Sequence, residues 1–404
     1  MTALLEQFYN QSGFPYMNIG SQKYILPEVM GYSDLGLAID KAEFDKVACG
    51  IAQALDSGIN TIVNLPKSKI AEYGYPLESI NLISQTSTNN LSLMRLSFVI
   101  NREDNLPVLI EVNSQTPSLN YELESGTQLM QKLSLKLPQI SVEHLTNCLS
   151  NQLYNLANQL GKPLEQCNIG LLTCDSPEDI YQMNYYKNLI IEQNLGKSAE
   201  VVTNLNFGFD SEGYCCGSLT NSRYDILFNW YPLEWAVKES FGSGESFARL
   251  LDNAINSNRV AIFNGVESFV VQNKNYLVFM QAEDLWPKNV QNHVSDSYYT
   301  ESELLTTQSS NCNWIAKPIW GRHGTGVFGS VDFRKFWGDL SDEYYNNQDC
   351  IYQPLWTSKL FGNQKATLEV FVYKVSNQWE AGGMGLRLSP DIITNASASC
   401  QMVA

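Results

Sequence analysis

The chain has few histidines and few basic residues. It contains 3 histidines among 404 residues, and its 26 Lys and Arg against 42 Asp and Glu give a net charge of −16. His144, His293 and His323 lie too far apart in the sequence to form a metal-ligand pattern. The acidic balance argues against a nucleic-acid partner. It favours a cationic small molecule only slightly, because many soluble proteins are acidic.

Long apolar runs are also missing. Runs such as 188–191 are far too short to span a bilayer, and no basic segment followed by an apolar one opens the chain. The 9 cysteines are scattered, and the adjacent Cys215 and Cys216 cannot form a CxxC metal knuckle. No G-x-S-x-G nucleophile motif occurs. We therefore expect a cytoplasmic protein with reduced thiols and no membrane partner.

Length and composition are those of a globular protein with two or three domains. Hydrophobic residues make up 44% of the chain and charged residues 17%. Strand and helix patterns are mixed, which predicts an α+β or α/β fold. We expect an N-terminal part over 1–165, a small α/β domain over 166–245, and a β-rich part over 246–404.

Local patterns predict several elements. They are a helix over 41–58 that ends at Gly58, a hairpin with strands 92–100 and 106–112, a helix over 141–160, a strand over 169–174, and a helix from Pro177 to about Gln193. The last helix begins with Ser176 as a capping residue and a proline in its first turn.

Residues 314–327 are the most informative stretch. A short apolar run delivers Lys317, and a loop with Gly321, Gly324 and Gly326 follows. A P-loop has its lysine after the glycines, so the order here favours a nucleotide held between two β-sheets. A period-two pattern at 331–333 predicts the far arm of a hairpin. The alternative is an ordinary glycine-rich hairpin with a solvated lysine.

A second candidate site lies at the end of the strand before residue 113. Glu111 and Asn113 are two apart and therefore face the same side of a strand. Their carboxylate and amide oxygens suit Mg²⁺. Arg95 on the partner strand can reach the same site. Alone, the pattern is more typical of a polar strand end next to a turn.

Two further segments complete the set. Residues 383–387 end in Arg387, which can bind a carboxylate or an acyl phosphate, or can be an exposed charge at a strand end. Pro354, within 351–356, removes a backbone donor, so we expect that strand to have one unpaired edge. Such an edge can offer backbone groups to an adenine.

In this order, these segments resemble the synthetase domain of the glutathionylspermidine synthase family, a permuted branch of the ATP-grasp superfamily. Residues 175–179, D-S-P-E-D, resemble the family's helix start, and 227–235, L-F-N-W-Y-P-L-E-W, resemble its K-L-Y-P-W-E-W segment. Thr394 and Asn395 resemble its closing region. The resemblance runs from about residue 15 to the C-terminus and includes no cysteine amidase segment.

The resemblance implies an ATP-grasp fold with permuted order and a small pre-ATP-grasp-like domain. It implies ATP-dependent joining of a peptide carboxylate to an amine through an acyl phosphate, with ATP and Mg²⁺ as cofactors and only small molecules as partners. The residue roles that it implies are as follows: Glu111 and Asn113 as metal ligands; Lys274 and Lys317 at the ATP phosphates; Gly321, Arg322, Gly324 and Gly326 in a lid; Gln353 and Leu355 beside the adenine; and Arg95 and Arg387 at the acyl phosphate.

One position departs from the family pattern. The family has a metal-binding Asp in Arg-x-Asp, whereas this chain has Ser97, a poor Mg²⁺ ligand. Either a carboxylate such as Glu122 or Glu124 substitutes, or the metal binds more weakly, or the protein is a catalytically silent homologue that binds a nucleotide or a partner. A ligase for other substrates, such as a peptide and an amino acid, is a further alternative. The sequence predicts no oligomeric state.

Overall fold

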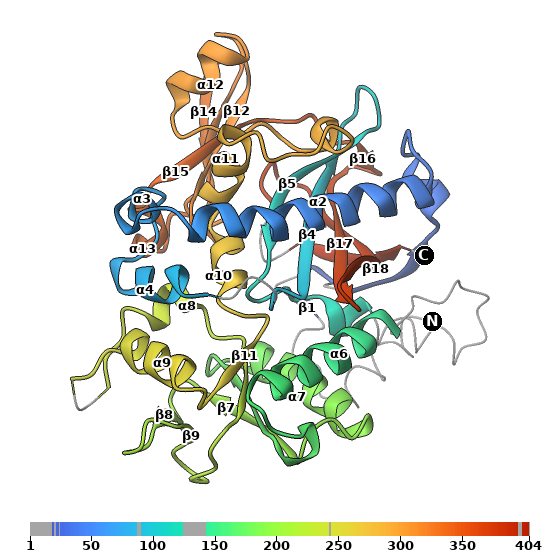
Figure 1. Ribbon diagram of the computed structural model, residues 1–404. Coiled ribbons are helices and arrows are strands. Elements are labelled where there is room, and N and C mark those ends of the chain that lie inside the picture. Colours follow the sequence, from blue (N-terminus) through green and yellow to red (C-terminus); the bar gives the residue numbers. More distant parts are fainter. Residues whose placement is uncertain are drawn as a thin grey trace.

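A computed structural model describes residues 18–19, 22–23, 25–86, 90–123, 143–241, 244–394 and 398–403 (Figure 1). Three larger sheets organise this part of the chain. No helix in these ranges is both long and apolar enough to cross a membrane.

The central sheet joins strands from both ends of the chain. Its order is β3 (Ile25–Met30), β19 (Ser399–Val403), β18 (Gln378–Ser389), β17 (Gln364–Val375), β4 (Leu93–Ile100) and β5 (Pro107–Asn113), with β16 (Leu360–Phe361) beside β17. All neighbours pair antiparallel except β3 and β19. The hairpin predicted before residue 113 is confirmed as β4 and β5. The pairing of β4 with β17 brings residues some 270 positions apart into register.

Helix α2 (Lys41–Val63) covers one face of this sheet, in front of β17 and β18 (Figure 1). Its apolar side packs with the sheet into the main hydrophobic core. Asp40 caps its N-terminus by accepting a hydrogen bond from the backbone of Glu43. The predicted end at Gly58 is wrong, because the helix continues to Val63. A Cβ at Gly58 would collide with the side chains of Met280 and Tyr276, so this glycine permits close packing and does not end the helix.

The small α/β unit has a parallel four-stranded sheet. Its order is β11 (Ala261–Phe263), β10 (Ile226–Asn229), β6 (Asn168–Thr173) and β7 (Ser198–Thr203). The predicted helices at 141–160 and from Pro177 are confirmed as α6 (Glu143–Gln159) and α7 (Pro177–Glu192). Ser176 caps α7 as expected. Because β11 lies beyond residue 245, the sheet extends past that predicted boundary, and the division at 165 and 245 stays a prediction.

The third sheet carries the glycine-rich stretch. Its antiparallel order is β14 (Arg334–Trp337), β13 (Phe328–Val331), β12 (Trp314–Pro318) and β15 (Cys350–Pro354). The predicted hairpin is confirmed, but its far arm is 328–331 rather than 331–333. Asp332 and Phe333 have positive φ angles of 48° and 62° and form the turn into β14. As Pro354 predicts, β15 is an edge strand.

Shorter elements connect these sheets. They are α3 (Lys67–Glu72), α4 (Ile80–Ser84), α8 (Leu233–Ala236), α9 (Phe247–Asn256), α10 (Glu267–Gln272), α11 (Asn275–Ala282), α12 (Glu301–Thr307), α13 (Glu343–Asn346), and the hairpins β1 (Asn18–Ile19) with β2 (Gln22–Lys23) and β8 (Phe207–Phe209) with β9 (Cys215–Gly217).

Candidate active site

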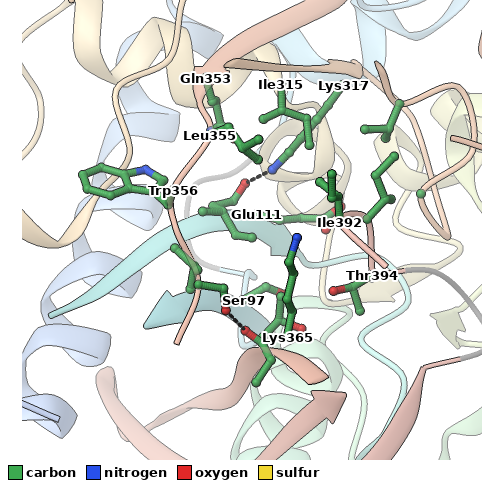
Figure 2. A pocket seen from close by; sticks show the side chains of 18 of the residues that line it. Ser97, Glu111, Ile315, Lys317, Gln353, Leu355, Trp356, Lys365, Ile392 and Thr394 are labelled. Carbon is green, nitrogen blue, oxygen red and sulfur yellow. Dashed lines mark hydrogen bonds between the residues drawn. The ribbon is translucent and has the colours of Figure 1, made fainter. Parts of the chain in front are cut away.

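A pocket of about 370 Å³ lies between the third sheet and the central sheet. Figure 2 shows Gln353 and Lys317 on one side, Ser97 and Lys365 on the other, and Glu111 between them. Its size is that of a small-molecule site. Eight of the predicted site residues line it: Glu111, Lys274, Lys317, Gly321, Gly324, Gln353, Leu355 and Arg387. The sequence patterns therefore converge on one cavity, and the individual roles stay predictions.

Two lysines and one carboxylate form the charged centre of the pocket. Lys274 Nζ lies 3.0 Å from Glu111 Oε1 and donates to the carbonyl of Gly321 at 2.7 Å. Lys317 Nζ donates to the carbonyl of Ile110 at 2.9 Å. These bonds hold the Lys274 ammonium group at the first glycine of the loop and the Lys317 ammonium group at the backbone next to Glu111. Anionic phosphate oxygens would find two cations in place there.

Burial and the neighbouring charges shift the pKa values of this cluster. Burial alone would raise the pKa of Glu111, but Lys274, Lys317 and Arg95 outweigh it and lower the pKa to about 2. Burial lowers the pKa of Lys317 to about 8, against the opposing effect of Glu111. The carboxylate is therefore ionised at neutral pH, whereas the lysine loses its proton in mildly alkaline solution.

A second charged cluster lies on the central sheet. In register, Ser97 on β4 stands between Glu111 on β5 and Glu369 on β17. Ser97 Oγ donates to Glu369 Oε2 at 2.6 Å, and Thr367 Oγ1 donates to Glu369 Oε1 at 3.0 Å. Arg95 Nε lies 3.1 Å from Glu369 Oε2. The position where the family has an aspartate is thus occupied by a serine that contacts a carboxylate from another strand.

Four predicted residues are not among the described residues that line the pocket: Arg95, Asn113, Arg322 and Gly326. Asn113 Oδ1 accepts a hydrogen bond from the backbone of Thr116 at 3.3 Å. Arg95 Nη1 donates to the carbonyl of Ser118 at 2.8 Å. The two residues are in register with each other across the hairpin, and that Arg95 reaches the metal site stays a prediction.

Arg322 makes contacts other than those predicted for it. Its Nη2 donates to Glu234 Oε1 at 2.6 Å, and its Nη1 donates to Thr116 Oγ1 at 2.7 Å. Glu234 is 0% exposed, and Gln115 Nε2 donates to its other oxygen at 2.7 Å. The guanidinium thus anchors the glycine loop to α8 of the small α/β unit instead of lining the pocket.

Several lining residues were missed, although one strand carried a signal for them. Lys365, Thr367 and Glu369 all line the pocket from β17. They alternate with Ala366 and Leu368, and residues two apart share one face of a strand. Polar side chains in alternation on a mostly buried strand are the pattern of a strand that faces a site. Arg102, Trp356 and Thr394 also line the pocket.

Titratable groups with shifted pKa values lie near Arg387. Burial, Glu122 and Asp179 raise the pKa of Glu178 to about 7, while Arg387 opposes that increase. Burial and nearby arginines, among them Arg387, lower the pKa of His323 to about 4. Glu178 belongs to the D-S-P-E-D segment, and His323 to the glycine loop. Such shifts are common at functional sites.

Of the two carboxylates named as substitutes for the missing aspartate, only Glu122 belongs to the described residues, and it does not line the pocket. Glu122 is buried outside it, and Glu124 lies outside the described residues, as does Asn395. Within the described ranges, no three His, Cys, Asp or Glu side chains gather closely enough to hold a metal ion. A metal here would need ligands from the nucleotide as well.

A pocket between two sheets, with a glycine loop above it and a small α/β unit beside it, defines a protein of the ATP-grasp type. The structure is similar over 100% of this chain and 97% of the other to a glutathione synthetase-like effector from Globodera pallida in its apo form, with a TM-score of 0.57 and 11% identity. At that identity the likeness concerns the fold alone. The predicted fold class is confirmed.

The chain belongs to the glutathionylspermidine synthase pre-ATP-grasp family, whose sequence profile matches residues 4–402. It is also 27% identical over 208 residues, 49% of this chain, to a Haemophilus influenzae protein provisionally described as an acid–amine ligase. The matched part spans about half of that relative, 46% of its length.

Proposed function

We propose that the protein is an ATP-dependent ligase that joins a carboxylate to an amine. The observation that carries the proposal is the meeting of Lys274, Lys317 and Glu111 in a pocket between two sheets. Membership of the glutathionylspermidine synthase family supports the reaction class. The name of the Haemophilus influenzae relative agrees with it.

ATP would lie with its phosphates at the two lysines and its base toward β15. Lys274 and Lys317 supply charge next to Gly321, and Gly324 with its φ of 75° lets the loop backbone turn closely over the phosphates. Gln353 and Leu355 line the pocket on the side of Ile315 and Lys317 (Figure 2). On the outer edge of β15, Tyr352 exchanges both backbone hydrogen bonds with Tyr298, so the backbone offered to an adenine would be that after Tyr352.

The donor set fits a Mg²⁺ ion that is shared with phosphates. Glu111 is ionised, lines the pocket and offers hard oxygen ligands, and Mg²⁺ in nucleotide sites takes one or two carboxylates plus phosphates and waters. Asn113 lies two residues along the same strand. The ion would neutralise charge on the phosphates during transfer.

The acid would lie on the Arg387 side of the pocket. The carboxylate would take the γ-phosphoryl group of ATP and release ADP. The amine would then attack the acyl phosphate, and the tetrahedral intermediate would collapse to the amide with loss of inorganic phosphate and of the amine proton. Arg387 lines the pocket and is suited to a carboxylate or an oxyanion. Glu178, with its pKa near 7, is suited to binding the amine or accepting its proton. A peptide acid with a polyamine is the pair that the family suggests.

The test is ADP formation by purified protein with ATP and Mg²⁺, in the presence of peptide acids and amines, followed by mass analysis of the product. We expect ADP only when both an acid and an amine are present. Nucleotide binding without turnover with any pair would favour the catalytically silent homologue, for which Ser97 is the observation. Absence of nucleotide binding would overturn both.

A further inference from the structure

We propose that Glu369 replaces the aspartate that the family has at position 97, and that it holds the metal ion of the nucleotide together with Glu111. The inference rests on the proposed ATP site and concerns its metal ligands. Nothing in the order of the sequence links the residues, since Ser97 and Glu369 are 272 positions apart. They become neighbours only through the pairing of β4 with β17.

The strand register supports the replacement of the family's aspartate by Glu369. Ser97 is directly opposite Glu111 on one side and Glu369 on the other, and all three line the pocket. Paired strands lie about 4.8 Å apart. A glutamate is one methylene longer than an aspartate, so its carboxylate can extend part of that distance toward the serine. The dashed line at Ser97 in Figure 2 marks the resulting contact, 2.6 Å long.

The hydrogen bonds orient the Glu369 carboxylate. Ser97 donates to Oε2 and Thr367 donates to Oε1, so both oxygens are fixed. An aspartate at 97 would repel this carboxylate, whereas a hydroxyl binds it. Ser97 is therefore a positioning residue in this arrangement, because it orients the Glu369 carboxylate.

Burial and charge favour a ligand role over simple charge balance. Glu369 is 1% exposed, and an ionised carboxylate needs strong compensation when it is buried. Arg95 supplies part of it at 3.1 Å, but Arg95 also donates to Ser118. A carboxylate has about four acceptor positions. Ser97 and Thr367 each fill one by a hydrogen bond, whereas Arg95 Nε makes an ion pair at 3.1 Å without a hydrogen bond. Because Glu369 lines the pocket, its remaining acceptor positions can serve a ligand there.

The resulting ligand set matches the needs of Mg²⁺. Glu111 and Glu369 flank Ser97 from opposite strands and supply two negative charges, as Glu111 and the family's aspartate would. One or two carboxylates with phosphates and waters complete an octahedral ion. Of the carboxylates weighed as substitutes, Glu122 does not line the pocket.

The experiment measures Mn²⁺ binding to the protein with ADP, by electron paramagnetic resonance and by titration calorimetry. Turnover is not required. We expect Glu369→Gln to weaken Mn²⁺ binding at least tenfold while ADP binding in EDTA stays within twofold. The matched control is Glu380→Gln on β18, whose carboxylate pairs with His144 away from the pocket. It should leave both affinities unchanged.

A relocation variant distinguishes a metal ligand from a partner of Arg95. Ser97→Asp combined with Glu369→Gln returns the charge to β4 and should regain most of the Mn²⁺ affinity. Ser97→Asp alone should not strengthen binding, because two carboxylates would then repel each other. If Glu369→Gln does not fold, the double variant carries the test. Its Mn²⁺ affinity is then compared with that of Glu111→Gln, which lacks the other proposed ligand. A double variant that binds Mn²⁺ no more tightly than Glu111→Gln overturns the assignment.

The remaining outcomes separate this inference from the proposed function. Folded Glu369→Gln with unchanged Mn²⁺ affinity overturns the inference and leaves the ATP site intact. Tight, Glu369-dependent Mn²⁺ binding without turnover with any acid and amine supports the inference while the ligase proposal fails. Unaltered protein that binds neither ADP nor Mn²⁺ overturns both.

Discussion

Two cation–carboxylate pairs lie at the glycine loop, and among the described residues one of them faces the pocket while the other is buried in protein. Lys274 is 3.0 Å from Glu111, whose side chain is 36% exposed. Arg322 is 2.6 Å from Glu234, whose side chain is 0% exposed. The first pair can exchange its contacts with a ligand, whereas the second is almost fully buried and does not line the pocket.

The difference teaches that a cation in a glycine-rich loop need not bind phosphate. Arg322 follows Gly321 directly, yet Glu234 and Thr116 take up its donors. Lys274 is 47 residues away from Gly321, yet it donates to the carbonyl of that glycine. Which cation is available depends on where the partner carboxylate lies. The two pairs should accordingly respond in opposite ways to substitution.

The largest effect should come from breaking the enclosed pair. Arg322→Met leaves Glu234 buried without its cation, and removal of one partner of a buried pair costs about 3–5 kcal/mol of stability. The double variant Arg322→Met with Glu234→Leu should recover most of that loss, because it removes both charges. Urea unfolding of the three proteins measures the effect. A double variant as unstable as the single one would contradict the comparison.

Lys317, which lies beside the Lys274–Glu111 pair, should show the reverse pattern: substitution should lower activity and leave stability intact. Lys317→Met removes a pocket cation and should lower turnover about 10²–10³-fold, the range seen when one stabilising group is lost from a reaction centre. Stability should stay equal or rise, because burial disfavours the charged lysine. Steady-state rates test the expected loss of turnover, and thermal unfolding tests the expected stability. A large loss of stability with unchanged turnover would place Lys317 among the structural residues.

Sequence patterns predicted the local half of this site well. The strand that ends in Lys317, the hairpin that carries Glu111, and the cap at Ser176 each depend on neighbours within a few residues. Periodicity and turn chemistry are readable over that range. The position of Lys317 opposite Glu111 then followed from the resemblance to a family, not from the pattern.

The other half depends on contacts between residues that are far apart in the sequence, which no local pattern contains. The contact of Ser97 with Glu369 follows from the β4–β17 register, and the burial of Arg322 follows from α8. Gly58 was misread for the same reason. A glycine that admits Met280 and Tyr276 looks the same in sequence as one that ends a helix.

A smaller effect should appear with pH. Since burial lowers the pKa of Lys317 to about 8, the lysine is charged below that pH and neutral above it. Phosphate binding favours the charged form, so ADP affinity in EDTA should be level up to about pH 8. It should then fall by up to about tenfold per pH unit, with uptake of one proton on binding. Calorimetry measures both quantities, and Lys317→Met should remove the dependence. A flat profile for the unaltered protein would mean that Lys317 does not contact the phosphates.

The smallest effect concerns Lys365, the pocket cation that local reasoning missed. Figure 2 shows it extending into the pocket from the side of Ser97, opposite Lys317. Lys365 is only partly buried, and this burial lowers its pKa. Because water screens a partly exposed charge, Lys365 should attract a phosphate less strongly than Lys317 does. A hydrogen bond from such a group contributes about 1 kcal/mol, and Lys365→Met should therefore weaken ADP binding about fivefold.

The matched control is Lys335→Met on β14, an exposed lysine that does not line the pocket. Equal affinities for the two variants would limit the phosphate-binding cations to Lys274 and Lys317. A loss as large as that of Lys317→Met would instead make the central sheet an equal partner in nucleotide binding.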